Sequence, residues 1–156
     1  MELQRTLVLI KPHVFIDFIE SGPLTIIADI QEKYTYRDLK IIRVKKVNFS
    51  VELIQSFYKE HSKKPFFLGL IKAMTVGPCL AMVLEGVNAV FKVRGINGAT
   101  NPKEAKAGTL RHDYGRHEKG PNNGVHGSDS LESAEREVNI IFSEIEMEKR
   151  GWERIK

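Results

Sequence analysis

The sequence predicts an α+β fold in which an antiparallel sheet of four strands carries helices on one face. The chain of 156 residues is 42% hydrophobic and 28% charged, which suits one compact domain over residues 1–156. Short apolar runs alternate with segments of helical periodicity, and no internal repeat, linker or low-complexity tract interrupts them. The resulting order of strand, helix, strand, helices, strand, loop, strand and helix is typical of a ferredoxin-like sandwich.

The first two predicted strands enclose one helix in the sequence. Residues 6–10 form an apolar run typical of a buried strand, which Lys11 and Pro12 end. A helix is expected over residues 23–33 and a half-exposed strand over residues 39–47. The helix face directed at the sheet is expected to comprise Leu24, Ile27, Ile30 and Gln31.

Two further helices are expected after the second strand. Ser50 is the expected N-cap of the first, whose buried face comprises Ile54, Phe57, Tyr58 and His61. The second covers residues 66–74, and its core face comprises Phe67, Leu70, Ile71 and Met74. Phe66 points off this face, so it is either a stacking platform for a ligand or a second core contact.

A third strand and a long loop come next. Residues 79–84 are apolar on both faces of a strand, which predicts a central position in the sheet. A short helix over residues 88–93 is expected to end at Arg94. Residues 95–123 show neither a helical nor a strand period, and a loop of this length in a small domain is functional or disordered.

The chain is expected to close with a strand and a long helix. Val125 and His126 belong to the fourth strand, and Ser130 caps the helix, which is expected to reach residues 149–151. Its inward side chains are expected to be Leu131, Ala134, Val138, Ile141 and Ile145.

The stretch around His126 carries the clearest functional signal. Residues 122–130 read NNGVHGSDS, which places a histidine between two glycines just before a helix start. An uncharged imidazole is a competent nucleophile near neutral pH, and flanking glycines let a bulky ligand approach it. The alternative is that His126 merely ends a strand. Lys11 has two interpretations of the same kind, as the edge of the sheet or as a fixed cation at a site beside it.

Composition and charge set the expected surroundings. A net charge of +4 favours anionic partners without separating nucleotides from nucleic acid. Cys79 is the only cysteine and allows a reducing compartment, so the cytoplasm is the expected location. No apolar run approaches the length of a membrane span, so no membrane association is expected. His112 and His117 lack the sulfur ligands of common zinc sites, so no protein-held metal is expected.

Five short segments follow one another in a recognisable order. They are residues 6–12 (TLVLIKP), 65–70 (PFFLGL), 98–102 (GATNP), 108–111 (GTLR) and 126–130 (HGSDS). In this order they resemble nucleoside diphosphate kinases over nearly the whole chain. The chain has no Gly-x-x-x-x-Gly-Lys-Ser/Thr loop, so discrete side chains would have to hold the phosphates.

The resemblance implies a ping-pong phosphotransfer. The γ-phosphate of a nucleoside triphosphate, typically ATP, would pass to His126 and then to a nucleoside diphosphate. Glu137 would orient the His126 ring, while Phe66 would stack on the base with Leu70 beside it, giving broad base specificity. The residues that would surround the phosphates and the sugar are Lys11, Tyr58, His61, Arg94, Thr100, Arg111 and Asn123.

The same resemblance implies Mg²⁺ carried by the nucleotide phosphates, no requirement for nucleic acid, and a homohexamer or homotetramer. The chain departs from the family pattern at His13, where aspartate is usual, and at His112, where glycine is usual. It also has extra residues between Arg111 and His126. Two outcomes are open for His112, a strained turn with positive φ or a turn that the extra residues have relaxed. Because insertions in surface loops relax strain at little cost, the second is expected, with an ordinary φ and the ring toward solvent.

Overall fold

The structure is a computed structural model that describes residues 2–148. Its sheet consists of β1 (Leu3–Ile10), β2 (Lys40–Val47), β3 (Cys79–Val87) and β4 (Val125–Gly127). The strands lie in the order β2-β3-β1-β4, and each neighbouring pair is antiparallel. The predicted four-stranded antiparallel sheet is therefore confirmed, and so is the central place of the third strand.

Eight α-helices and two short 3-10 helices lie within the described residues. They are α1 (Pro12–Asp17), η1 (Ile19–Ser21), α2 (Pro23–Thr35), α3 (Val51–Phe57), η2 (Lys59–His61), α4 (Phe67–Thr75), α5 (Ala89–Asn97), α6 (Leu110–Tyr114), α7 (Leu131–Ile141) and α8 (Glu144–Glu148). The helices α1 and α6 were missed by the sequence analysis, because a helix of one or two turns shows too little periodicity to be recognised.

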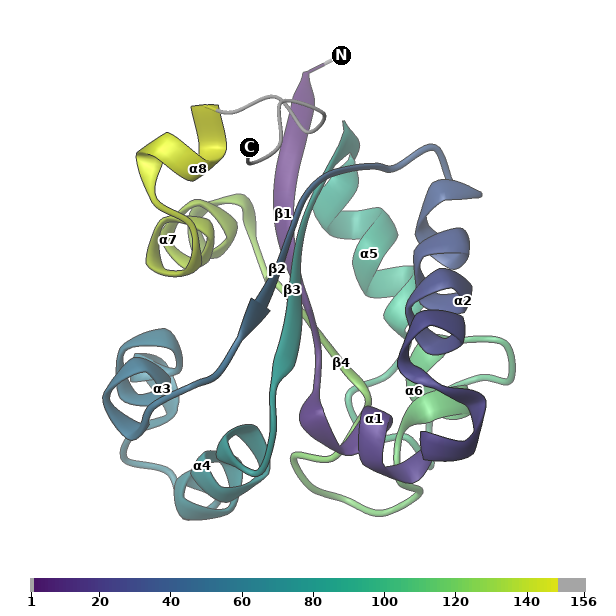
Figure 1. The fold of residues 1–156 in the computed structure, drawn as a ribbon, viewed down its shortest axis with the longest axis vertical. Helices are drawn as coiled ribbons and strands as arrows, with labels where there is room; N and C mark the ends of the chain where they lie inside the picture. The colour runs from purple at the N-terminus through teal and green to yellow at the C-terminus, as the bar shows by residue number, and fades with distance from the viewer. Residues whose placement is uncertain (1, 149–156) are drawn as a thin grey trace.

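Helices cover both faces of the sheet, so the prediction of one covered face was wrong (Figure 1). Successive side chains of a strand point to opposite faces, and in β1 both sets are apolar. Leu7 and Leu9 pack in a core with α3, α4 and α7, whereas Val8 and Ile10 pack in a second core with α1, α2 and α5. A sheet that is apolar on both faces is stable in water only when both are covered.

The predicted inward face of α2 was partly wrong. Its buried residues are Ile26, Ile30 and Tyr34, while Leu24 is 81% exposed. Of these three buried residues, only Ile30 was predicted to face the sheet. The Tyr34 hydroxyl donates a hydrogen bond to Asn97 Oδ1 at 2.6 Å, a contact with α5 that periodicity does not show.

The helix after Ser50 is shorter than predicted. Ser50 is confirmed as its N-cap, because Ser50 Oγ accepts a hydrogen bond from the Leu53 amide at 3.1 Å. However, α3 ends at Phe57. Tyr58 follows it as the C-cap and His61 lies in η2, so these two side chains do not share a face of α3. The turn between them changes the direction in which each side chain points.

The final helix is broken in two, contrary to the prediction. Phe142 has an extended backbone (φ −115°, ψ 131°), and α8 starts again after it. Ser143 and Glu146 form a capping box, in which each side chain accepts a hydrogen bond from the other residue's amide at 3.1 Å. The Ser-x-x-Glu pattern of residues 143–146 is a sequence signal for this restart.

The packing of the two terminal helices follows from this break. Ala134, Val138 and Ile141 of α7 are buried as predicted. Leu131 and Ile145 are 51% and 67% exposed, so their inward assignment was wrong. The predicted helix end at residues 149–151 lies outside the described residues.

Candidate active site

His126 lies in the middle of the edge strand β4. It faces Leu9 of β1 in the antiparallel ladder, between the buried residues Val125 and Gly127. A Cβ at position 127 would lie 2.7 Å from Asn97 Nδ2, so only glycine fits there. Gly124 has φ +86°, a conformation that side chains rarely adopt. The glycines that flank His126 are thus required by packing against α5 and by the turn into β4.

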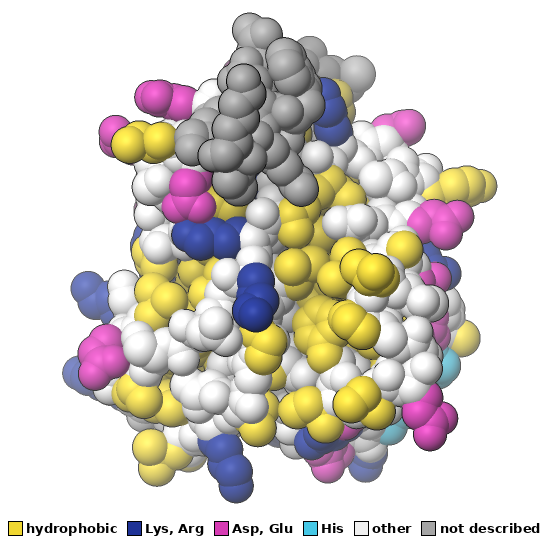
Figure 2. Space-filling model, in the orientation of Figure 1, with side chains coloured by type: hydrophobic (Ala, Val, Ile, Leu, Met, Phe, Trp, Pro, Cys, Tyr) yellow, Lys and Arg dark blue, Asp and Glu magenta, His cyan; other side chains and the backbone are white. Residues whose placement is uncertain are grey.

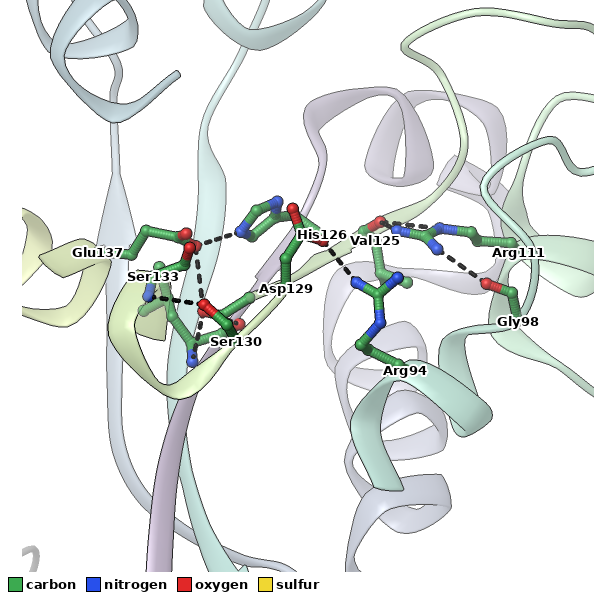
Figure 3. Close-up of polar contacts among 11 residues, drawn as sticks. Arg94, Gly98, Arg111, Val125, His126, Asp129, Ser130, Ser133 and Glu137 are labelled. Carbon is green, nitrogen blue, oxygen red and sulfur yellow. Dashed lines mark hydrogen bonds and ion pairs between the residues drawn. The ribbon is translucent and has the colours of Figure 1, made fainter. Parts of the chain in front are cut away.

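The ring of His126 is oriented by the first turns of α7. Its Nε2 lies 2.5 Å from Glu137 Oε1 (Figure 3). The Ser128 hydroxyl donates to the same oxygen at 3.0 Å. A carboxylate accepts hydrogen bonds, so the His126 proton sits on Nε2 and the lone pair lies on Nδ1. The imidazole therefore has its free lone pair on Nδ1, the ring nitrogen that does not contact Glu137.

Aromatic rings pack around the His126 imidazole. The rings of Phe57 and Tyr58 meet it edge to face, with centroid distances of 5.1 and 5.8 Å. The Tyr58 hydroxyl is buried and has no hydrogen-bond partner among the described residues. Burial raises the pKa of Tyr58 well above its ordinary value, so this hydroxyl stays protonated. A protonated hydroxyl without a partner can donate a hydrogen bond to a bound ligand.

Lys11 is a buried cation at the end of β1. Its Nζ donates a hydrogen bond to the carbonyl of Pro121 at 2.9 Å, and its side chain is 6% exposed. Burial lowers the pKa of Lys11 to about 7, and the nearby Arg111 guanidinium lowers it as well. Of the two interpretations of Lys11, the fixed cation agrees with this geometry.

Arg94 and Arg111 point toward the same region from α5 and α6 (Figure 3). Arg111 is anchored by hydrogen bonds to the carbonyls of Gly98 at 2.8 Å and Val125 at 3.1 Å. Arg94 instead pairs with Asp129 at 2.5 Å and is half exposed. One guanidinium is thus fixed by the backbone beside His126, whereas the other is held by an exposed carboxylate from which it can turn to a ligand.

Tyr58, His61 and Phe66 form a row of rings that leads away from His126. Ring centroids are 6.2 Å apart between Tyr58 and His61, and 5.6 Å between His61 and Phe66. Phe66 is 50% exposed at the start of α4, so it is not simply a second core contact. Leu70, one turn later in α4, is buried in the hydrophobic core.

Thr100 and Asn123 are joined in the loops beside Arg111. Asn123 Nδ2 donates to the carbonyl of Thr100 at 2.9 Å, while Asn123 Oδ1 is buried without a partner among the described residues. The residues that the sequence analysis assigned to the site therefore lie in one connected region, and Leu70 packs in the core next to it. The region offers an imidazole with a free ring nitrogen, cations and unpaired polar atoms, which are groups that phosphoryl transfer can use.

Comparison with known proteins agrees with this chemistry. The sequence pattern of the family described as nucleoside diphosphate kinase matches residues 4–147. The nucleoside diphosphate kinase of Campylobacter curvus is 45% identical over 141 residues, which cover 90% of this chain and 96% of that protein. The enzyme of Campylobacter fetus subsp. fetus is 43% identical over 145 residues, 93% of this chain and 99% of that protein. The chain belongs to the nucleoside diphosphate kinase family.

Solved structures show the same relationship for the fold of this kinase. The nucleoside diphosphate kinase of Aquifex aeolicus aligns with a TM-score of 0.81 at 34% identity, over 93% of this chain and 99% of that chain. The Halobacterium salinarum enzyme, solved in complex with CDP, aligns with a TM-score of 0.80 at 36% identity, over 93% of this chain and 91% of that chain. The ferredoxin-like class and the assignment as a nucleotide-binding phosphotransferase are confirmed.

Sequence reasoning missed the contributions of two residues of the kinase. Ser128 donates a hydrogen bond to the Glu137 oxygen that faces His126, and it lies just after β4, two residues beyond His126. His13 accepts a hydrogen bond from the Gly124 amide at 2.8 Å. No local pattern indicates that contact, because the two residues are 111 positions apart. Among the described helices, none is long and apolar enough to cross a membrane.

Proposed function

We propose that this kinase transfers the γ-phosphate of a nucleoside triphosphate, typically ATP, to nucleoside diphosphates through a phosphohistidine on His126. The observation that supports this proposal most directly is the contact of His126 Nε2 with Glu137 at 2.5 Å, because it leaves Nδ1 unprotonated. An imidazole held in one tautomer and backed by a carboxylate is an activated nucleophile. The aromatic rings around it limit its rotation.

The reaction has two half-steps that mirror each other. The His126 Nδ1 lone pair attacks the γ-phosphorus, an N–P bond forms, and the bond between that phosphorus and the β–γ bridging oxygen breaks. The diphosphate leaves with that electron pair, and Glu137 stabilises the positive charge on the ring. A second diphosphate then attacks the phosphorus with a terminal oxygen of its β-phosphate, and the N–P bond breaks to restore His126.

The charge of the transferred group is matched by side chains around His126. Lys11, Arg94 and Arg111 supply positive charge, and the Tyr58 hydroxyl can donate into the same space. His61, Thr100 and Asn123 lie where further phosphate and sugar oxygens would need partners. Phosphoryl transfer depends on such positioning and charge stabilisation more than on covalent chemistry by the protein.

Magnesium is expected to bind with the nucleotide rather than to the protein alone. Within residues 2–148 no group of three or more His, Cys, Asp or Glu side chains could hold a metal ion. The donors around His126 are mainly cationic, which suits a phosphate-bound ion and not a protein cage. The ion would neutralise phosphate oxygens, and no residue of this chain is assigned as its ligand.

Broad base specificity is part of the proposal. Phe66 offers an exposed aromatic ring, and every base has a face that can stack on it. Leu70 is 5% exposed, so it would support the Phe66 ring from within the core and offer little surface to the base. The Lys64 ammonium lies 5.7 Å from the centre of the Phe66 ring, so a base must share or displace that contact.

We also infer a homohexamer or homotetramer that works in the cytoplasm. Figure 2 shows hydrophobic side chains exposed over the middle of the face viewed in Figure 1. A contiguous apolar area on the surface is typical of a face that is covered in an assembly. The lone cysteine, buried Cys79, is compatible with a reducing compartment. Sedimentation of the purified protein measures its mass in solution and distinguishes four subunits from six.

The covalent step is tested by mixing the protein with γ-labelled ATP and removing the nucleotide. Label that stays on the protein and is lost in acid but not in base is expected for phosphohistidine. His126→Ala should retain no label while still binding ADP, and His117→Ala, at an exposed histidine, should be labelled normally. Initial rates at varied donor and acceptor should give parallel lines. Label on His126→Ala, or none on the wild-type protein, would reject the covalent mechanism.

A further inference from the structure

His13 is a buried histidine whose two ring nitrogens are both occupied. It lies in the second position of α1 and is 1% exposed. Nε2 accepts a hydrogen bond from the Gly124 amide at 2.8 Å, and Nδ1 lies 3.0 Å from Asp17 Oδ2. Asp17 in turn accepts two hydrogen bonds from the Arg116 guanidinium, at 2.9 and 2.8 Å. A continuous chain of contacts thus runs from Gly124 through His13 to Arg116.

The Gly124 contact determines the protonation state of the ring. A backbone amide can only donate, so His13 Nε2 must carry a lone pair. The single proton of the neutral ring is then on Nδ1, from which it is donated to Asp17. A protonated imidazole has no acceptor, and it would leave the buried Gly124 amide without this partner. Only the neutral ring supports the observed geometry.

Residues 121–124 make several other contacts that depend on the same conformation. The Lys11 amide donates to the carbonyl of Gly124 at 3.0 Å, and Lys11 Nζ donates to the carbonyl of Pro121 at 2.9 Å. The Arg116 amide donates to the carbonyl of Asn122 at 2.8 Å. The segment holds Asn123 beside Thr100 and leads directly into β4 with His126. His13 therefore contacts the one stretch that connects the sugar and phosphate side of the site to the nucleophile.

We propose that His13 is a positioning residue for the phosphotransfer reaction, acting only as a neutral imidazole that holds residues 121–124 in their nucleotide-binding conformation. The inference rests on the proposed function for the roles of Asn123 and His126. His13 does not touch the reacting atoms. It acts through the Gly124 amide, and its effect should fall mainly on nucleotide binding.

The surroundings of His13 favour the neutral ring at physiological pH. The charged groups that face it are Asp17 on its own helix, Arg116 in the loop after α6, and Lys11 at the end of β1. Burial lowers the pKa of His13 below its ordinary 6.5; Asp17 opposes this shift, and Arg116 and Lys11 add to it. The contact with Gly124 is therefore present above pH 6.5 and is lost as the pH falls through the lowered pKa.

Two substitutions of His13 test the contacts of its two ring nitrogens separately. His13→Gln places an amide oxygen near the former Nε2 and can still accept from Gly124, but it does not titrate. His13→Asn keeps a donor near Asp17 and loses the acceptor for Gly124. His117→Gln removes an exposed imidazole from the same region and serves as the matched control. The Michaelis constant and turnover of each variant are measured from about pH 8 down to the lowest pH at which the enzyme stays folded, together with hydrogen exchange of the Gly124 amide without nucleotide.

His13→Asn should raise the Michaelis constant about fivefold relative to the wild type near pH 8, with a smaller change in turnover, and should remove the protection of the Gly124 amide. His13→Gln should match the wild-type protein near pH 8. As the pH falls below 6.5, the wild type should show a rise in Michaelis constant and a loss of Gly124 amide protection, measured relative to the intrinsic exchange rate. His13→Gln should show neither change. If His13→Asn does not fold, the comparison of His13→Gln with the wild type carries the test.

The inference is overturned if wild-type Gly124 protection does not depend on pH below 6.5, or if His13→Asn keeps the wild-type Michaelis constant and exchange rate. A wild-type protein that transfers no phosphate would instead reject the proposed function. Hydrogen exchange at Gly124 would still report on His13 in that case, so the two failures are distinguishable.

Discussion

Ser128 and Glu137 are joined by a buried hydrogen bond in which Oγ donates to Oε1 at 3.0 Å. The same carboxylate oxygen faces His126 Nε2 at 2.5 Å. A single oxygen therefore contacts both the His126 ring and the serine two residues beyond it. Ser128 Oγ also accepts a hydrogen bond from the Leu7 amide at 3.3 Å, which ties the carboxylate to β1. The orientation of His126 is thus set by α7 and the sheet together.

Glu137→Gln should slow phosphorylation of His126 more than it weakens nucleotide binding. The substitution removes the charge that stabilises the ring as it gains a phosphoryl group, and a hydrogen bond to a charged group contributes about 1.5–3 kcal/mol. Single-turnover labelling should therefore slow about tenfold to a hundredfold. Ser128→Ala keeps the charge and should slow it less. An unchanged single-turnover rate in Glu137→Gln would show that Glu137 does not assist the phosphorylation of His126.

Phe66→Ala should weaken the binding of purine and pyrimidine diphosphates by a similar factor. One stacked base contributes about 1–3 kcal/mol, and the exposed Phe66 ring distinguishes none of the bases. Dissociation constants for ADP, GDP, CDP and UDP measure the effect. Leu68→Ala, which removes an exposed apolar side chain from the same helix, is the control and should change none of them. A loss confined to purines would show that the base sits elsewhere.

Nucleotide binding should take up a proton at about pH 8 because Lys11 then becomes charged. Its pKa is about 7 in the free protein, and a bound polyphosphate stabilises the ammonium. The second ionisation of a terminal phosphate lies near pH 6, so the nucleotide itself contributes little at that pH. Calorimetry in two buffers with different ionisation enthalpies measures the uptake. Lys11→Gln should bind more weakly and take up no proton.

The same shift affects folding with a definite sign. Between pH 7 and 10.5 the unfolded chain binds a proton on Lys11 that the folded chain has released. The contribution of Lys11 to the free energy of unfolding therefore rises with pH in this window. If the wild-type protein and Lys11→Gln take up the same number of protons on nucleotide binding at about pH 8, the lowered pKa of Lys11 is contradicted.

His112→Gly should destabilise the kinase slightly and leave its activity almost unchanged. The prediction of an ordinary φ for His112 is confirmed, because Asp38 and Asn88 are the non-glycine residues with positive φ in the described part of the chain. His112 lies inside α6, where glycine costs about 0.5–1 kcal/mol relative to alanine. Its Nδ1 also lies 3.0 Å from Asp113. Denaturant melts measure the loss, and a gain in stability would indicate strain at this position.

The parts of the fold that were predicted correctly depend on local interactions. Ser50 and Ser130 were recognised as N-caps because serine before a helical pattern is typical of that position, and the structure confirms them, since each side chain accepts a hydrogen bond from an amide three residues on. The central strand over residues 79–84 was recognised because its apolar run is continuous. The missed helices α1 and α6 are too short for periodicity, and the break at Phe142 overrides a helical pattern that continues past it.

The sequence by itself determined the family and the residues of the candidate site, His126 with Lys11, Arg94, Arg111 and Phe66 among them, because their residue types and order along the chain carry that information. Only the tertiary structure decided which atom of His126 is free, that Arg94 rests on Asp129 while Arg111 is held by carbonyls, and that both faces of the sheet are covered. The contact of His13 with Gly124 is of the same kind. Hydrogen bonds and packing between residues far apart in the chain depend on how the strands and helices assemble, and no local pattern specifies that assembly.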